Sequence, residues 1–347
     1  MRLEPIAAPS LGRRFGVTAT AFALVVALAS GLAMISGADP FATLGLIVRG
    51  GLGSKLALLE TLNRATPLIF TGLAVAVAFR ARLWNIGAEA QLYAGAIVTV
   101  LLGTGALGSP FVLPVSALAA MLAGALMLLG PVLLKTRLGV DEVVTTLLLN
   151  FVMLLFVGYL LEGPMKDPMG MGWPKSPALI AEARLPRIVT GLRLHWGFGI
   201  ALLAAVVVWV VERRTRLGFE MRATGANIAA ARFAGMPVNT VLVRTALMSG
   251  GLAALAGWSE VAGLKGHLSQ DLSPGFGYTG IVVAMLAALN PLGVVPAALF
   301  VAAVFVGSDS MSRAAGVPTY IADILLAASL LAVLVAMRLS RFRMVRG

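Results

Sequence analysis

The side chains best able to do chemistry in this sequence stand in the stretch NIGAEAQ, residues 85–91. It places one carboxylate, Glu89, and two amides, Asn85 and Gln91, between two apolar runs. One explanation is helix capping, with Asn85 as the N-cap and Glu89 in a first turn where the helix dipole favours an acid. Capping leaves Gln91 unexplained. We therefore favour a break in the chain that lines a pathway, because irregular backbone in an apolar layer persists only beside protein or a water-filled cavity.

A second polar group stands in GVDEVVTTLLLN, residues 139–150. Glu142, Thr146 and Asn150 are four residues apart, so in a helix they share one face. A polar stripe on an apolar helix is costly unless it faces other helices or water. Asp141 is a candidate N-cap of the same helix, and this modest role is compatible with the first.

Several kinds of chemistry are excluded. The chain has no cysteine, which removes disulfides, thiolate metal sites and cysteine nucleophiles. No GxxxxGK[ST] motif is present, and GFGYTG at 275–280 lacks the strand that a dinucleotide fold needs before it. Its glycines more plausibly allow a backbone break or close helix approach. His195 and His267 are far apart in loop-like sequence, so we expect interfacial roles. We expect no catalytic residue, no metal site and no cofactor bound by this chain.

Composition places the chain in a membrane. Of its 347 residues 59% are hydrophobic and 12% charged, against roughly 45–50% and about 25% in soluble domains. The formal net charge is +12, but the cations occupy short spacers between apolar runs. This distribution indicates membrane topology rather than nucleic-acid binding.

Ten apolar runs predict an all-α polytopic protein, a single transmembrane domain over residues 1–347. The expected spans are 17–36, 61–80, 87–106, 111–134, 141–161, 196–211, 238–262, 277–290, 292–307 and 319–337. The eighth and ninth are shorter than the ~17 residues needed to cross a bilayer, so one or both are expected to be broken. Helices two to five and seven to ten then run in opposite senses, as in an inverted repeat.

Topology follows from the cations. Clusters of Lys and Arg precede the first run and follow the second, fourth, sixth and tenth, which predicts that both termini are cytoplasmic. The first run follows Arg13 and Arg14 and exceeds the about 7–15 apolar residues of a signal peptide, so we expect a retained helix. The proline-rich segment 162–195 is expected to be an external loop without a packed core.

The longest internal segment is expected at 212–237, and its sequence is basic. Asn227 can cap a short helix that Gly235 ends. Between these caps lies a small, smooth surface of alanines, Ala229, Ala230, Ala231 and Ala234. The segment is either an ordinary basic loop on anionic lipid or a docking surface for a cytoplasmic partner.

Four segments together resemble the permease subunit of ABC importers for nucleosides and simple sugars, within the branched-chain amino acid and ribose type superfamily. They are ATPLIFTGLAVAVAFRARLWNIGAEAQ, GVDEVVTTLLLN, GANIAAARFAGM and GFGYTGIVVAMLAALNPLGV. The resemblance covers residues 41–337 and implies a ten-helix permease in the bacterial inner membrane. It also implies a second permease subunit in a homo- or heterodimer, a cytoplasmic ABC ATPase that uses ATP, and a periplasmic or lipoprotein substrate-binding protein.

The same resemblance assigns the loop that meets the ATPase to Gly225, Asn227, Ala230, Ala231 and Gly235. Two residues depart from the family pattern: Ala90 stands where glycine is usual and Asp141 where asparagine is usual. We expect the first to tighten the backbone beside the pathway. The residues expected to line the substrate pathway are Asn85, Glu89, Gln91, Glu142, Thr146, Asn150, Trp258 and Phe276.

The expected substrate is a nucleoside, with purines favoured, and a ribose-like simple sugar is the alternative. The family motifs are slightly closer to the nucleoside branch. Aromatic faces stack on bases, and aromatic side chains flank the polar breaks, namely Trp84, Tyr93, Trp258, Phe276 and Tyr278. Sugars also stack on aromatics, and such residues are often interfacial anchors.

A different class, an ion-coupled secondary transporter, would use isolated acids such as Glu89, Glu260 and Asp323 as ion sites. Such a transporter does not need the 222–236 loop, which favours the ATP-driven class. A membrane enzyme has no support, because no nucleophile–base pair, metal cluster or cofactor loop is found.

Overall fold

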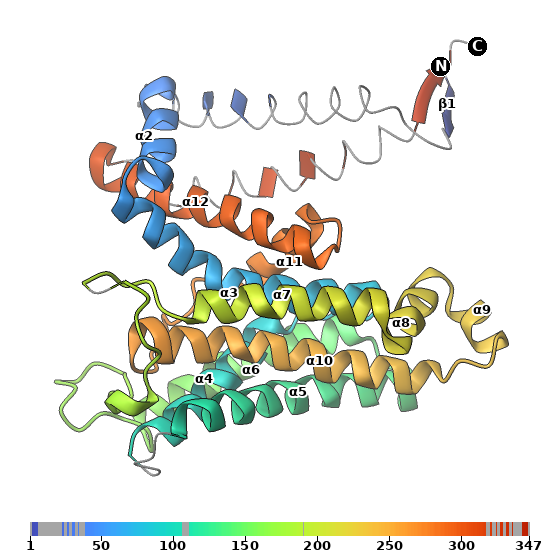
Figure 1. The fold of residues 1–347 in the computed structure, drawn as a ribbon, viewed down its shortest axis with the longest axis horizontal. Helices are drawn as coiled ribbons and strands as arrows, with labels where there is room; N and C mark the ends of the chain where they lie inside the picture. The colour runs from blue at the N-terminus through green and yellow to red at the C-terminus, as the bar shows by residue number, and fades with distance from the viewer. Residues whose placement is uncertain are drawn as a thin grey trace. The chain divides into compact units, whose positions relative to one another are not determined.

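The structure, a computed structural model, describes residues 39–105, 111–189 and 191–316 without a break. It also describes 2–5, 342–345 and separate positions between 23 and 34 and between 320 and 335. The chain forms two compact units, one of Met1–Thr61 with Phe300–Gly347 and the other of Leu62–Leu299 (Figure 1). The expected first and last spans, 17–36 and 319–337, lie outside the continuously described residues.

The smaller unit contains a helix that the sequence analysis missed. The expected spans leave residues 37–60 unassigned, but α2 (Pro40–Leu52) is helical. Asp39 is its N-cap and accepts a hydrogen bond from the Phe41 amide at 2.9 Å. An N-cap aspartate followed by proline is a common helix start, so the signal was present in the sequence. The unit also holds the antiparallel strands β1 (Arg2–Pro5) and β2 (Phe342–Val345) and the end of α12 (Pro291–Ala315).

The larger unit is a bundle of apolar helices, as predicted. Its elements are α3 (Lys55–Arg80, from Leu62 on), α4 (Ala88–Gly103), α5 (Val112–Leu138), α6 (Glu142–Glu162), η1 (Ala181–Ala183), α7 (Gly197–Arg214), α8 (Arg216–Ala226), α9 (Ile228–Phe233), α10 (Val238–Ser259), η2 (Glu260–Lys265), α11 (Phe276–Leu286) and the start of α12. Within the described chain, five helices are long and apolar enough to cross a membrane: α3, α5, α6, α10 with its extension η2, and α12. The all-α polytopic prediction is confirmed.

Small residues hold the centre of this bundle together. α10 lies alongside α5 and α4 (Figure 1), and Gly124 of α5 faces Gly250 of α10 so closely that a Cβ on either would overlap the other's carbonyl oxygen. Gly257 meets the Leu92 carbonyl of α4 in the same way. Glycine at such contacts lets helix backbones approach within van der Waals distance, which is how membrane helices pack.

The two short runs expected near the C-terminal end of the bundle have different outcomes. The eighth, 277–290, becomes the short helix α11, as predicted. The prediction for the ninth, 292–307, is wrong about its length, because α12 continues to Ala315 and is long enough to span. Hydropathy misses the extension because Ser308, Asp309, Ser310 and Ser312 dilute the apolar signal.

The segment between α6 and α7 is more ordered than expected. Its backbone pairs with residues that follow α10: the amides of Ser176, Leu179 and Leu185 donate to the carbonyls of Leu268, Gly266 and Ala262 at 2.8–2.9 Å. The Leu179 and Leu185 side chains are buried. The segment was expected to be an external loop without a packed core, and its packing on residues 262–268 was not foreseen. Buried backbone groups must find partners, and here the partners come from a distant part of the chain.

His195 ends this segment and is fully buried. Its Nδ1 accepts a hydrogen bond from the Gly197 amide at 3.1 Å, and the ring fills the space where Gly263 lacks a side chain. Burial lowers the pKa of His195 to about 4, so the ring is neutral near pH 7. The residue acts as packing between the segment and η2.

Candidate functional site

The stretch around residues 81–87 leaves helical form between α3 and α4. Arg82 adopts a left-handed conformation with φ of 54°, which turns the chain back toward the bundle. α4 begins at Ala88 with Gly87 as its N-cap and no side-chain cap. The break in the helix is present, and the alternative in which Asn85 caps α4 is wrong. That the break lines a pathway stays a prediction. Glu89 does lie in the first turn of α4.

Asn85 instead forms a buried amide pair with Gln91. Asn85 Nδ2 donates to Gln91 Oε1, and Gln91 Nε2 donates to Asn85 Oδ1, each at 2.9 Å. Asn85 Nδ2 also donates to Ser249 Oγ at 3.0 Å, and that hydroxyl donates to the Ala74 carbonyl at 2.7 Å. Gln91, which capping left unexplained, therefore pairs with Asn85 across the break. Asn85 connects the segment to Ser249 of α10 and, through that hydroxyl, to Ala74 of α3.

The polar face of α6 serves the same broken segment. Glu142 Oε1 accepts from the Trp84 amide at 3.2 Å, and Thr146 Oγ1 accepts from the Ile86 amide at 3.3 Å. Asn150 donates to the Ile86 carbonyl and accepts from the Ala90 amide, both at 2.9 Å. The prediction of one shared face is confirmed. These side chains satisfy backbone groups that a break in a membrane helix would leave without partners.

Two acidic residues at the start of α6, Asp141 and Glu142, have further contacts. Lys135 of α5 forms an ion pair with Glu142, so a positive charge balances this carboxylate at the start of α6. Asp141 is the N-cap of α6 and accepts from the Val143 amide at 2.8 Å, as expected.

Glu89 joins two helix N-termini. Its Oε2 accepts from the Gly277 amide at 2.6 Å, in the first turn of α11, while its own backbone begins α4. One carboxylate thus lies at the positive ends of two helix dipoles, which stabilise its charge. Gly277 is required here because a Cβ would overlap the Glu89 backbone. Gly275 is the N-cap of α11, and the Ser273 hydroxyl, two residues earlier, accepts from the Phe276 amide at 2.8 Å.

This junction of α4 and α11, centred on Glu89 and Gly277, lies well inside the bundle. At the far end of α11, the Leu289 carbonyl accepts from Arg80 Nη2, at the end of α3. Gly280 packs on Thr71, near the middle of α3. A helix of 11 residues is about 16 Å long, roughly half of a ~30 Å hydrocarbon layer. The junction is therefore near the middle of the membrane-spanning helices.

The junction also fits the expected inverted repeat. The irregular residues 81–87 follow the long helix α3 and precede the short helix α4. The residues 266–275 follow α10 with η2 and precede the short helix α11. A pair of short, interrupted helices in corresponding positions of two halves is typical of transporter binding sites.

The predicted aromatic residues separate into two groups. Trp258 donates from its indole N–H to Ser116 of α5 at 3.1 Å and is buried, so it does not join the hydrogen-bonded group around Asn85. Phe276 is buried at the start of α11, and Tyr93 donates to the Gln270 carbonyl at 2.6 Å. Two of the five, Trp84 and Tyr278, are exposed.

The second predicted site, the coupling segment formed by α8 and α9, has the expected caps. Asn227 is the N-cap of α9 and accepts from the Ala230 amide at 3.1 Å. Gly235 has φ of 78°, a left-handed conformation that ends a helix. Ala230 is exposed, as a docking surface requires.

Other residues of the coupling segment differ from expectation. Ala231 is buried, so it packs inward and is not part of the smooth surface. Gly225 lies against the end of α3, where a Cβ would overlap the Arg80 carbonyl oxygen. Phe233 is 96% exposed and was missed. A lone aromatic residue beside four alanines in a basic loop was its sequence signal.

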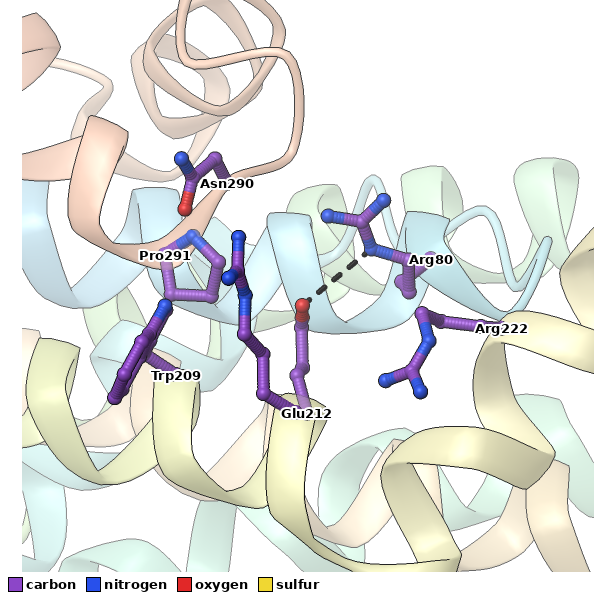
Figure 2. A pocket seen from close by; sticks show the side chains of 7 residues that line it. Arg80, Trp209, Glu212, Arg222, Asn290 and Pro291 are labelled. Carbon is purple, nitrogen blue, oxygen red and sulfur yellow. Dashed lines mark ion pairs between the residues drawn. The ribbon is translucent and has the colours of Figure 1, made fainter.

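A pocket of about 440 Å³ lies beside the coupling segment (Figure 2). Its walls come from α3, α7, α8 and the turn before α12, and it is lined by Arg80, Trp209, Glu212, Arg213, Arg222, Asn290 and Pro291. Glu212 Oε2 lies 3.5 Å from Arg80 Nε. The pocket was not predicted, because its residues are distant in the sequence.

Comparison with known proteins identifies related chains. Residues 57–334 match the family described as "Branched-chain amino acid transport system / permease component". The chain is 37% identical over 326 residues to the glucose ABC transporter permease protein TsgB13 of Haloferax volcanii, covering 90% of this chain and 85% of that one.

Two further relatives have nucleosides in their names. The guanosine ABC transporter permease protein NupP of Bacillus subtilis is 34% identical, with 88% of this chain and 89% of the relative covered. The nucleoside ABC transporter permease protein NupB of Lactococcus lactis is 30% identical, with 80% and 79% covered. The family match includes the junction, the pocket and the coupling segment.

Proposed function

This chain belongs to the family of branched-chain amino acid transport system permease components, and from that premise we propose that it carries a nucleoside, with purines favoured, across the membrane as one subunit of an ABC importer. The observation that carries the proposal is the junction of two short helices at Glu89 and Gly277. The names of the relatives NupP and NupB support the substrate class.

The junction suits a neutral, hydroxylated substrate. Helix N-termini present amide donors, and the Glu89 carboxylate can accept hydrogen bonds from ribose hydroxyls. A small displacement of α11 from α4 would break the bond between Gly277 and Glu89 and release both groups to the substrate. The exposed Trp84 and Tyr278 are the remaining candidates for stacking on a base, worth about 1–3 kcal/mol each.

Alternating access would be driven through the coupling segment. In this proposal α9 docks on a cytoplasmic ABC ATPase, with Phe233 as the anchor and Ala230 allowing close contact. Movement of α8 reaches α3 through the contact of Gly225 with Arg80. The hydrogen bond from Arg80 to Leu289 then transmits this movement to the turn after α11. The junction would thereby open and close with the ATPase cycle.

The remaining parts of the proposal concern partners and location. The chain binds no ATP itself; the ATPase subunit hydrolyses it. A second permease subunit completes the pore, and a periplasmic or lipoprotein binding protein delivers the substrate. The assembly is placed in a bacterial plasma membrane, with both termini of this chain in the cytoplasm because its cation clusters follow the positive-inside rule.

A simple sugar is the second candidate substrate, and a specific observation favours it. The relative at 37% identity is a glucose permease, and a sugar would use the same hydroxyl contacts at Glu89. Burial of Trp258, Tyr93 and Phe276 also removes much of the aromatic surface expected to favour a base.

Uptake of labelled substrates tests the choice. Guanosine, adenosine, uridine, glucose and ribose are compared in cells with and without the gene for this chain. We expect gene-dependent uptake of guanosine that unlabelled adenosine inhibits. Gene-dependent uptake of glucose or ribose alone would replace the nucleoside by the sugar.

A further inference from the structure

The pocket beside the coupling segment carries an excess of positive charge. Arg80, Arg213 and Arg222 face a single acid, Glu212. Figure 2 shows the Arg80 and Arg222 side chains on one side of Glu212 and Asn290 above it. Its volume of about 440 Å³ is within the ~300–1,000 Å³ of small-molecule sites. A pocket of this charge and size suits an anionic group.

Three buried atoms that line the pocket have no hydrogen-bond partner among the described residues: Arg80 Nε, Glu212 Oε1 and Arg222 Nη1. Of these, Arg80 Nε is already engaged in the ion pair with Glu212 Oε2. Glu212 is 3% exposed; its Oε2 faces Arg80, but its Oε1 has no hydrogen-bond partner among the described residues. Arg222 Nη1 is also buried and has no partner in the described part of the chain. Such groups are costly to leave unpaired in an apolar bundle. The pocket thus offers one donor and one acceptor to a ligand.

We propose that this pocket binds a phosphate ester that carries a hydroxyl group. Guanidinium groups hold phosphate oxygens with strong, charge-assisted hydrogen bonds, which is the role of Arg222 and Arg213. The ligand's hydroxyl donates to Glu212 Oε1, and Asn290 lies at the rim. Arg80 contributes charge, while it keeps its ion pair with Glu212 and its hydrogen bond to the Leu289 carbonyl.

The surroundings favour a phospholipid headgroup as the source of this phosphate. The outer side of α7 leads to the pocket and exposes apolar side chains, Leu203, Val206, Val207 and Val210, along which an acyl chain can lie. Arg213 sits 5.5 Å above the Trp209 ring, and tryptophan is enriched at the membrane–water interface. Basic pockets between membrane helices bind anionic headgroups. Phosphatidylglycerol supplies both the phosphate and the hydroxyls.

Binding here would affect the coupling segment. The ligand would contact α7 and α8 and lie beside Arg80, which holds α3 to the turn after α11. An occupied pocket would therefore restrain α8 relative to α3, in addition to the contact at Gly225. The inference requires only that the chain spans a membrane and does not depend on the substrate.

The test is lipid retention by the full chain purified in detergent, measured by native mass spectrometry. The probes are phosphatidylglycerol, phosphatidylmethanol, which has the same charge without hydroxyls, and phosphatidylcholine. We expect phosphatidylglycerol to bind most tightly, and Arg222→Gln to weaken it about tenfold, as for loss of one charged hydrogen bond. Arg214→Gln, which changes an exposed arginine at the end of α7 that does not line the pocket, should leave lipid binding unchanged.

Further arms separate the possible outcomes. Glycerol phosphate and inorganic phosphate are titrated against wild type and Arg222→Gln by thermal shift; binding that depends on Arg222 and displaces lipid would support the phosphate site with a soluble source. Equal retention of phosphatidylglycerol by wild type, Arg222→Gln and Arg213→Gln would overturn the proposal. Equal binding of phosphatidylmethanol and phosphatidylglycerol would overturn the role of the hydroxyl. Arg213→Gln alters an exposed side chain and serves if Arg222→Gln does not fold.

Discussion

Two polar regions of the same bundle differ in how many of their buried polar groups have hydrogen-bond partners within the protein. Around the broken segment 81–87, the amides of Asn85 and Gln91 bond to each other and the face of α6 bonds to the backbone. In the pocket beside the coupling segment, Glu212 and Arg222 each keep a buried atom that has no hydrogen-bond partner in the described part of the chain. The first region holds its own shape. The second has a buried donor and a buried acceptor that could bind a ligand. The polarity of the sequence alone does not distinguish the two regions.

The largest expected effect on stability comes from removing the Asn85 amide, which lies at the centre of the hydrogen-bonded region around residues 81–87. Asn85→Leu removes both hydrogen bonds of the Gln91 side chain to Asn85, and it also removes the Asn85 bonds to Ser249 Oγ and to the Gly87 amide. We expect the free energy of unfolding to fall by roughly 3 kcal/mol, since each unpaired buried group costs about 1–3 kcal/mol. Thermal unfolding in detergent measures this.

Its matched control lies in the pocket. Asn290→Leu changes the same residue type at an exposed position just before α12 and is expected to lower the free energy of unfolding by no more than about 1 kcal/mol, the typical contribution of a helix N-cap. If Asn85→Leu and Asn290→Leu lower the free energy of unfolding equally, the proposed difference in hydrogen bonding between the two regions is wrong.

The next effect concerns the contact between the two short helices. Gly277→Ala places a Cβ on the Glu89 backbone, and relieving such overpacking costs about 1–3 kcal/mol. We expect the junction to be forced apart and transport to fall at least tenfold. Gly130→Ala in α5 is the control, because its added Cβ meets nothing within 4 Å. Normal transport by Gly277→Ala would show that the contact is not used.

Glu89→Gln tests whether the junction's carboxylate matters beyond structure. The amide keeps the shape and can still accept from Gly277, but it lacks the charge that two helix dipoles favour. We expect transport per folded molecule to fall about tenfold, the loss of one charged hydrogen bond, while the unfolding temperature changes little. A lower unfolding temperature with unchanged transport would assign Glu89 to helix capping.

The smallest effect is expected at the surface of the coupling segment. Phe233→Ser removes an exposed side chain, so stability should be unchanged, but a docking anchor is worth about 1–2 kcal/mol. We expect substrate-stimulated ATPase activity of the assembled transporter to fall several-fold. Ala229→Ser, also exposed on α9, serves as the control. Full stimulation in Phe233→Ser would remove this residue from the docking surface.

Local features of the sequence determined much of this protein. Apolar runs separated by charge determined an all-α membrane bundle, because backbone groups in lipid must be paired within helices. Spacing by four placed Glu142, Thr146 and Asn150 on one face, and Asn227 and Gly235 marked the ends of α9. Each of these results depends only on residues within a few turns of one another.

The tertiary structure decided which polar groups meet. Asn85 is paired with Ser249, Glu89 with Gly277 and Arg80 with Leu289, and each pair is separated by more than a hundred residues in the sequence. The same packing buried Ala231, covered Trp258 and assembled the pocket at Glu212. Helical periodicity tells which face of a helix is polar, but the partner of that face depends on how the helices pack, and close glycine contacts such as Gly124 with Gly250 set that packing.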